Sequence, residues 1–459
     1  MGALPVQYLE AMEAFLGQEE FENYKSSIQE ESVRGLRFNP LKVPPQKQAA
    51  VLRTIFSEEK LDLVPWSLGV GYYYQGATPG KHPYHSAGLY YLQEPSAMAP
   101  GALLPIKPGD RVLDLCAAPG GKSTALGARL EGSGLLVSND RSVSRAKGLL
   151  KNLELFGIGN CLVTAEEPER LAGCFPEYFD KILVDAPCSG EGMFRREPSM
   201  AAEWEIRGPE YYAPIQKKLL SLACRMLRPG GFLLYSTCTF SVEENEGAVD
   251  WLLKETTDME LVTLKPDYGF VSGKDGASLR LFPWKLRGEG HFVALFQKKG
   301  QKILSVYGNG REENEGFLRK QKAFAEFRQK IRAPLEERGF YWERNGELYL
   351  LPVSAGELCP IRFLRTGLHL GTVKRERFEP SQALAMYLTR ETFSSSVDFP
   401  AEDIRVVKYL KGETVTTEGV LKTGEDGWCL ICVDGWPLGF AKRKKDTLKN
   451  KYYPGWRWK

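Results

Sequence analysis

The stretch Arg111-Val-Leu-Asp-Leu-Cys-Ala-Ala-Pro-Gly-Gly-Lys-Ser123 joins a short apolar run to a glycine-rich turn. We expect a buried strand over 111–115 and the start of a helix within 116–123. Gly120 and Gly121 let the backbone approach a ligand closely, and the first N–H groups of a helix are free to bind it. The stretch therefore predicts a ligand-binding loop at the carboxyl end of a strand.

Similar apolar runs recur after this loop and are separated by helical patterns. Alternation of this kind predicts an α/β fold with a mostly parallel, doubly wound sheet, as in Rossmann-like domains. The chain has 459 residues, a net charge of +3 and 43% hydrophobic residues, so it is expected to be a folded protein of two to three domains. The five runs are 111–115, 134–140, 181–185, 231–237 and 291–296.

The glycine-rich loop lacks the spacing that phosphate-binding loops need. A P-loop requires glycine where Cys116 stands, and the dinucleotide pattern G-x-G-x-x-G is absent. S-adenosylmethionine (SAM) carries a ribose and no phosphate. Asp140 ends the second expected strand, where an acid can bond ribose hydroxyls. The loop and this acid together favour SAM over a purely structural turn.

Two cysteines directly follow expected strands. Cys188 comes three residues after Asp185, and Cys238 follows Thr237. Carboxyl ends of parallel strands meet at one edge of a sheet, so both thiols are expected beside the glycine-rich loop. Their neighbours are Pro, Ser, Thr and Gly, which argues against ordinary buried core cysteines.

Methylation of a pyrimidine carbon is the chemistry that requires a thiol beside SAM. A thiolate that adds to C6 of cytosine makes C5 nucleophilic, a carboxyl group near N3 supports the addition, and a base then removes the C5 proton. Cys238, Asp185 and the loop 116–122 supply the thiol, the acid and the SAM site.

Three long motifs resemble those of Sun/Fmu-type RNA cytosine-5 methyltransferases. They are CAAPGGKS at 116–123, DAPCSGEGMFRR at 185–196 and STCTFSVEENE at 236–246, and residues 88–96 also look like a segment of that family. The resemblance spans about residues 30–299 and is greatest to the bacterial small-subunit (16S) rRNA methyltransferase F group, which carries a PUA-like C-terminal extension.

The resemblance implies a role for each site residue. It makes Cys238 the nucleophile and Cys188 the group that assists release of the methylated RNA. The family usually has Asp after the third strand; this chain has Glu166 and Glu167, and spacing favours Glu167 while Glu166 stays open. The SAM-binding residues that it implies are Cys116, Ala117, Ala118, Pro119, Gly120, Gly121, Lys122, Asp140, Glu167 and Asp185.

Four regions are expected along the chain. Their expected bounds are 1–95 for an N-terminal α+β RNA-recognition region, 96–299 for the SAM-dependent methyltransferase core, 300–380 for a linker helix with an α+β extension, and 381–459 for a PUA-like RNA-binding domain. The tail 441–459 holds eight basic residues and one acid, and 319–332 holds six against one. These charges predict an RNA-binding face, with bases stacked on Tyr452, Tyr453, Trp456 and Trp458.

The cysteines and histidines give no sign of a metal. Cys429 and Cys432 are three apart in an expected strand, so their thiols should point to opposite faces. His82 and His85 lack a third ligand. The sequence has nine cysteines, and we find in it no signal peptide and no apolar run of about 18 residues. These features predict reduced thiols in a cytoplasmic protein.

The leading hypothesis is a SAM-dependent enzyme that forms 5-methylcytosine in 16S rRNA within the small subunit, through a covalent bond between cysteine and C6. We expect no membrane association and no obligate protein partner. A tRNA cytosine-5 methyltransferase is an alternative, because the core motifs do not distinguish substrates. A non-catalytic RNA-binding factor for ribosome assembly is another, although a pure binder does not require Cys238 and Cys188. The loop spacing disfavours an ATPase.

Overall fold

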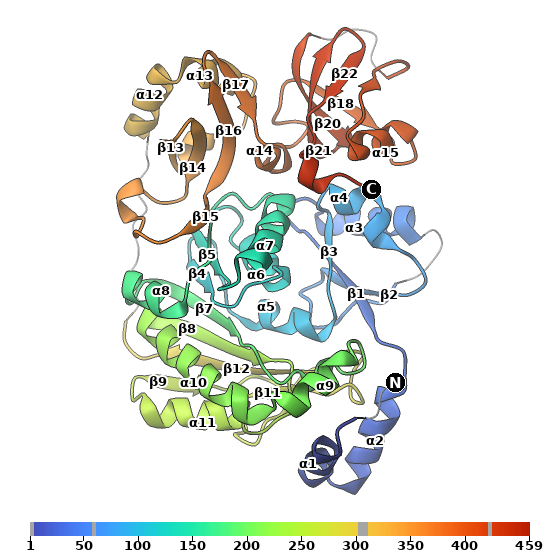
Figure 1. Ribbon diagram of the computed structural model, residues 1–459, viewed down its shortest axis with the longest axis vertical. Helices are drawn as coiled ribbons and strands as arrows, with labels where there is room; N and C mark the ends of the chain where they lie inside the picture. The colour runs from blue at the N-terminus through green and yellow to red at the C-terminus, as the bar shows by residue number, and fades with distance from the viewer. Residues whose placement is uncertain (1–3, 57–60, 302–310, 421–424) are drawn as a thin grey trace.

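A ten-stranded sheet forms the middle of the computed structural model, which describes residues 4–56, 61–301, 311–420 and 425–459 (Figure 1). Five neighbouring strands are parallel and confirm the expected core. In spatial order they are β6 (Cys161–Thr164), β5 (Leu135–Asn139), β4 (Arg111–Asp114), β7 (Phe179–Asp185) and β8 (Leu227–Thr237).

Helices cover both faces of this sheet, because alternate strand residues point to opposite sides. Val112 of β4 packs in the core shared with α6 and α7, whereas Leu113 packs in the core shared with α8, α10 and α11. The helices are α6 (Gly121–Arg129), α7 (Val143–Phe156), α8 (Pro168–Cys174), α10 (Pro209–Met226) and α11 (Glu246–Glu255). The arrangement is the doubly wound fold that the alternating pattern predicts.

Antiparallel strands extend the sheet at both edges. On one side, β12 (His291–Lys298) pairs with β8, followed by β11 (Leu279–Leu281) and β10 (Val271–Ser272), and β9 (Met259–Val262) also pairs with β12. On the other side, β15 (Phe363–Thr366) pairs with β6. A strand from the C-terminal third of the chain therefore completes the central sheet.

The N-terminal region contains two separate packing units. The helices α1 (Val6–Leu16) and α2 (Gln18–Ile28) pack in one aromatic cluster with α9 (Ser199–Ile206). A three-stranded sheet of β2 (Gly71–Tyr74), β1 (Arg34–Phe38) and β3 (Tyr90–Leu92) lies against the core, and α3 (Pro45–Phe56), α4 (Pro83–Ser86) and α5 (Ala99–Leu103) accompany it.

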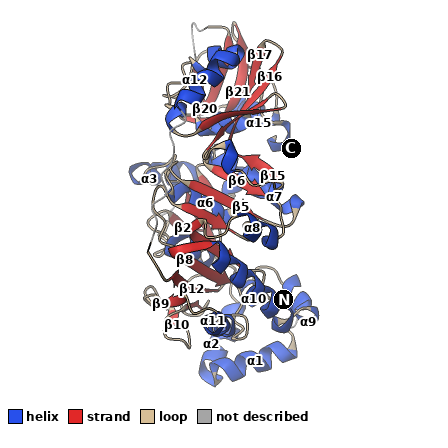
Figure 2. Cartoon of the chain, turned by 90° about the vertical axis from the view of Figure 1, so that its left-hand side faces the viewer, coloured by secondary structure: helices blue, strands red, loops and turns tan. Residues whose placement is uncertain are grey.

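Two further sheets form the C-terminal region, at the opposite end of the molecule from α1 and α2 (Figure 2). The first has the order β13 (Phe340–Arg344), β14 (Glu347–Leu351), β16 (Leu368–Lys374) and β17 (Arg377–Pro380). The second has the order β18 (Ser396–Phe399), β20 (Gly427–Val433), β21 (Trp436–Lys444), β22 (Thr447–Asn450) and β19 (Val415–Thr416). Their helices are α12 (Arg311–Lys320), α13 (Lys322–Arg328), α14 (Gln382–Tyr387) and α15 (Ile404–Lys411).

The expectation of reduced thiols is wrong for one pair. Cys174 and Cys359 form a disulfide with their Cα atoms 5.8 Å apart, because the docking of β15 on β6 brings the preceding loop against the end of α8. Cys429 and Cys432 follow the prediction: both are free, buried in β20 and packed in different core clusters.

The prediction that the tail aromatics stack on RNA bases is wrong for two of them. Tyr452 and Trp456 are only 2% and 8% exposed, because they fill the core between the second C-terminal sheet and α15. Trp458 is half-buried and its Nε1 donates to Ser86 Oγ. Tyr453 remains accessible at 53%.

The described residues show neither a membrane-spanning helix nor a cluster of metal ligands. Among the described residues, no helix is long and apolar enough to cross a membrane. The same parts of the chain hold no group of three or more His, Cys, Asp or Glu side chains that could bind a metal ion. His82 instead accepts a hydrogen bond at Nδ1 from the Tyr84 backbone N–H.

Candidate active site

The glycine-rich loop lies at the carboxyl edge of the sheet, between β4 and α6. Gly120 has φ +111°, and a Cβ there would lie 3.2 Å from Leu149, so glycine is needed for both conformation and space. The Arg145 guanidinium donates to the Ala118 carbonyl and the Asn152 amide to the Pro119 carbonyl. Helix α7 therefore holds the loop in place.

A cavity of about 660 Å³ opens beside this loop. Its wall includes Cys116 and Ala118 from the loop, Asp140 after β5, Glu167 before α8 and Asp185 at the end of β7. Acids at the ends of successive strands can accept hydrogen bonds from ribose hydroxyls. The donor and acceptor set thus fits SAM. Burial raises the pKa of the Cys116 thiol, which keeps it an unreactive part of the wall.

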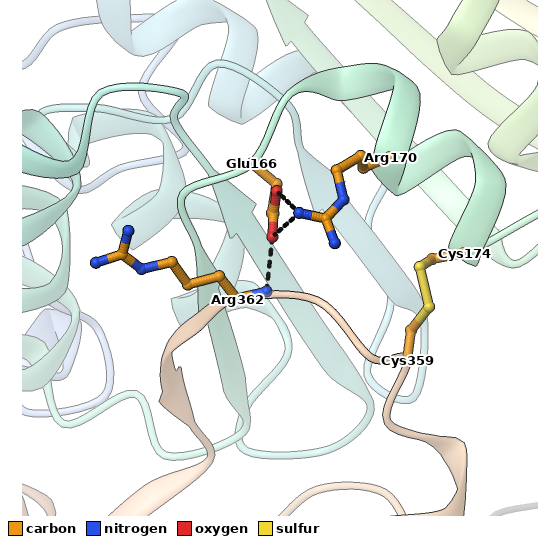
Figure 3. The surroundings of a disulfide bond; sticks show 5 residues. All are labelled: Glu166, Arg170, Cys174, Cys359 and Arg362. Carbon is orange, nitrogen blue, oxygen red and sulfur yellow. Dashed lines mark hydrogen bonds and ion pairs between the residues drawn. A yellow bond between two sulfur atoms is a disulfide. The ribbon is translucent and has the colours of Figure 1, made fainter.

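Glu166 and Glu167, which the sequence left as alternatives for binding SAM, lie in different surroundings. Glu166 is buried and points away from the cavity, where Arg170 and the backbone N–H of Arg362 bind its carboxylate (Figure 3). Glu167 lines the cavity. This placement supports Glu167 as the SAM-binding acid and gives Glu166 a structural contact with the segment before β15.

Asp185 is held at both of its carboxylate oxygens. Its Oδ2 lies 2.7 Å from Lys122 Nζ, and its Oδ1 accepts a hydrogen bond of 2.7 Å from Ser236 Oγ. Burial raises the pKa of this carboxyl, but the Lys122 ammonium and His291 outweigh burial and lower it well below its ordinary value. Asp185 is therefore a carboxylate that accepts hydrogen bonds.

The two cysteines after β7 and β8 lie side by side. The Sγ atoms of Cys188 and Cys238 are 3.3 Å apart, and the Cys238 backbone N–H lies 3.4 Å from Cys188 Sγ. The hydrogen bond with Cys238 and burial both raise the pKa of the Cys188 thiol well above its ordinary value. Cys188 thus holds its proton while it faces Cys238.

Two buried glutamates support the cysteine-bearing loops. Glu244 accepts hydrogen bonds from the Ser189 backbone N–H and from Gln216 Nε2, at 3.1 and 2.6 Å. Glu191 accepts from Thr239 Oγ1 and from the Phe240 backbone N–H, at 2.8 and 2.7 Å. These contacts fix the residues that follow each cysteine.

The structure brings every expected site residue to one edge, and it adds residues that sequence reasoning missed. Tyr211 and Tyr212 line the cavity from the start of α10. His291, the first residue of β12, lies 3.6 Å from Asp185. The sequence signal for His291 is weak, because only the antiparallel pairing of β12 with β8 brings the beginning of a strand to this edge.

A doubly wound sheet with this loop and these strand-end acids defines a SAM-dependent methyltransferase. The chain belongs to the 16S rRNA methyltransferase RsmB/F family, whose model matches residues 101–297. Models of the RsmF N-terminal domain, first C-terminal domain and PUA domain match 4–95, 326–388 and 396–458. The protein is thus a SAM-dependent rRNA methyltransferase.

Similar proteins agree with this assignment over most of the chain. Ribosomal RNA small subunit methyltransferase F of Enterobacter sp. (strain 638) is 31% identical over 97% of this chain and 93% of its own length. Its counterpart from Erwinia tasmaniensis is 30% identical over 98% and 95%.

Two solved structures share the fold of the core. A methyltransferase homologue from Pyrococcus horikoshii has a TM-score of 0.53 and 27% identity, and covers 64% of this chain and all of its own. NSun6 from the same organism, solved with the SAM analogue SFG, has a TM-score of 0.57 at 22% identity, with 65% and 99% covered.

Proposed function

We propose that this methyltransferase forms 5-methylcytosine in 16S rRNA through a covalent bond between Cys238 Sγ and C6 of the target cytosine. The observation that carries the proposal is the pair of thiols 3.3 Å apart, beside a carboxylate and a SAM-sized cavity. C5 of cytosine is a poor nucleophile, and a thiolate bonded to C6 makes it enamine-like. SAM supplies the methyl group as an electrophilic substituent of its sulfonium.

Asp185 suits the binding of the target base better than proton donation. As a carboxylate held by Lys122 and Ser236, it can accept a hydrogen bond from the exocyclic amino group of cytosine. Its low pKa makes it a poor acid toward N3. We therefore assign to Asp185 the orientation of the base against Cys238.

Cys188 serves two successive steps in this mechanism. Before the addition, its S–H donates a hydrogen bond to the Cys238 thiolate and stabilises it. Once Cys238 is bonded to C6, that hydrogen bond is lost, so Cys188 more readily releases its proton to solvent. Its thiolate then accepts the C5 proton, and Cys238 leaves as a thiolate. One proton is released per turnover.

The flanking regions are proposed to position the RNA. We keep the division into 1–95, 96–299, 300–380 and 381–459, with β15 as the exception that joins the core sheet. The C-terminal sheet presents exposed lysines that can neutralise phosphates: Lys442, Lys444, Lys445, Lys449 and Lys451. We expect this activity in the cytoplasm, without an obligate protein partner.

The test is a methyl-transfer assay with labelled SAM and three substrates: naked 16S rRNA, 30S particles and tRNA. We expect label in 16S rRNA, as 5-methylcytosine, in one of the first two samples. Comparison of those two shows whether the free RNA or the assembled subunit is the substrate. Label confined to tRNA, or in a base other than cytosine, would contradict the proposal.

A further inference from the structure

His291 begins β12 at the edge of the sheet that carries the active site. Phe292 pairs with Thr237 in the antiparallel ladder between β12 and β8. Continuing that register by one residue places His291 opposite Cys238. The side chain is only 4% exposed, so its polar atoms must be satisfied by the protein.

The two ring nitrogens of His291 both face acceptors. Nδ1 lies 3.1 Å from the Gly290 carbonyl oxygen, and Nε2 lies 3.6 Å from Asp185 Oδ1. Nε2 makes no hydrogen bond within the described residues. A ring N–H is a hydrogen-bond donor, so a proton on Nε2 would be directed at Asp185 Oδ1.

Asp185 is the acid available to the Nε2 atom of His291. Glu289, two residues earlier in the chain, is occupied by Arg195 Nε at 2.7 Å and by the Val33 backbone N–H. Glu94 accepts hydrogen bonds from the backbone N–H groups of Ser96 and Glu289. Lys122 contacts the other oxygen of Asp185, so it does not compete for Oδ1.

We propose that His291 is a positioning residue of this active site, which donates a hydrogen bond from Nε2 to the Oδ1 atom of Asp185 and so holds that carboxylate in place. The inference rests on the proposed function of Asp185 in orienting the target base. Lys122 restrains one oxygen and His291, with Ser236, restrains the other, so the carboxylate cannot rotate away from the base. The distance of 3.6 Å is longer than a hydrogen bond, and contacts of this kind in active sites often tighten only in the complex with substrate.

The kinetic test compares two substitutions of His291. His291→Phe keeps a ring but removes both nitrogens, and we expect kcat to fall about 10- to 100-fold while the KM for SAM stays within about twofold. His291→Gln restores an N–H near the position of Nε2 and should recover part of that loss. His369→Gln is the matched control, because His369 forms a histidine–carboxylate pair with Glu347 outside the active site.

The second measurement is independent of catalysis, and its main observation is made on the wild type. ¹⁵N NMR of histidine-labelled protein shows which ring nitrogen carries a proton, and the chain has four histidines to assign. We expect Nε2 of His291 to carry a proton in the wild type and its signal to shift in Asp185→Asn. An Nε2 atom without a proton in the wild type, or an unchanged kcat in His291→Phe, would overturn the proposal.

The two measurements also separate this proposal from the proposed function. A wild-type enzyme that does not methylate cytosine would contradict the function, whereas the NMR signal would still decide whether His291 Nε2 donates to Asp185. A methylating wild type whose His291 Nε2 atom carries no proton would contradict the positioning role alone.

Discussion

Ser189 and Thr239 share a hydrogen bond of 2.8 Å between their hydroxyl oxygens, although 50 residues separate them in the chain. Each directly follows one of the two active-site cysteines. Their hydroxyls also contact the buried carboxylates of Glu191 and Glu244. The loops after β7 and β8 therefore form one hydrogen-bonded unit, and the spacing of the two thiols is a property of the fold.

The two neighbouring glutamates should respond differently to substitution. Glu167→Gln removes a charged acceptor from the cavity wall, and we expect the Kd for SAM to rise about 10- to 100-fold. Glu166→Gln is the matched control: it should leave SAM affinity unchanged but lower the melting temperature, because it breaks the contacts with Arg170 and Arg362. Calorimetric titration and thermal unfolding measure the two effects. The reverse pattern would mean that Glu166 is the cofactor-binding acid.

Buried Asp114 should make the protein less stable as pH rises. Burial raises the pKa of this carboxyl to about 7, and Ser123 only partly offsets that effect. Because the folded-state pKa is above the unfolded value, the contribution of this carboxyl to stability is greatest below about pH 4. It falls until the pH passes 7, by an amount on the order of 4 kcal/mol.

Denaturant unfolding between pH 4 and pH 8 tests this dependence. Asp114→Asn removes the charge at nearly constant shape, so the variant should show a smaller loss over that range than the wild type. Parallel curves for the two proteins would show that Asp114 does not titrate there.

The disulfide should stabilise the docking of the C-terminal region on the core. Cys174 and Cys359 are 185 residues apart, and closing so long a loop restricts the unfolded chain. We expect a dithiol reductant to lower the free energy of unfolding by about 2–5 kcal/mol. A Cys174→Ser/Cys359→Ser variant should have the same free energy of unfolding as the reduced protein, and the reductant should not change it. A reductant effect of equal size in that variant would place its origin in other cysteines.

The exposed lysines of the C-terminal sheet should carry salt-dependent RNA binding. Replacing Lys444, Lys445 and Lys449 with Gln should weaken binding and reduce the slope of log K against log salt by about 2 to 3. Tyr453→Ala reports separately whether the accessible aromatic stacks on a base. An unchanged slope in the triple variant, measured by filter binding at several salt concentrations, would exclude this face as the RNA contact.

The site residues that the parallel strands position could be predicted from the sequence. The glycine-rich loop, Asp185, Cys188 and Cys238 all follow parallel strands, and the carboxyl ends of such strands share an edge. Their proximity could therefore be predicted without coordinates. The 3.3 Å between the thiols could not, because it depends on hydrogen bonds between distant loops.

Residues brought together by antiparallel or long-range pairing were not predictable in the same way. His291 reaches the site because β12 runs opposite to β8. The disulfide forms because β15 returns to the core after the chain has left it. Tyr452 and Trp456 were expected to stack on RNA bases because they lie in a basic tail. Their burial could not be foreseen, since the sequence does not show which side chains of such a tail pack in a core.

The most direct test of the account is the protein–RNA adduct on a denaturing gel. In the Cys188→Ala variant, Cys238 should still add to C6 and the bonded cytosine should accept the methyl group, but the RNA should not be released. A protein–RNA band of lower mobility should therefore accumulate in the presence of SAM. Cys238→Ser should form no such band, although it binds SAM with nearly wild-type affinity. Accumulation of the band in the Cys238 variant, and its absence in the Cys188 variant, would contradict the assigned roles.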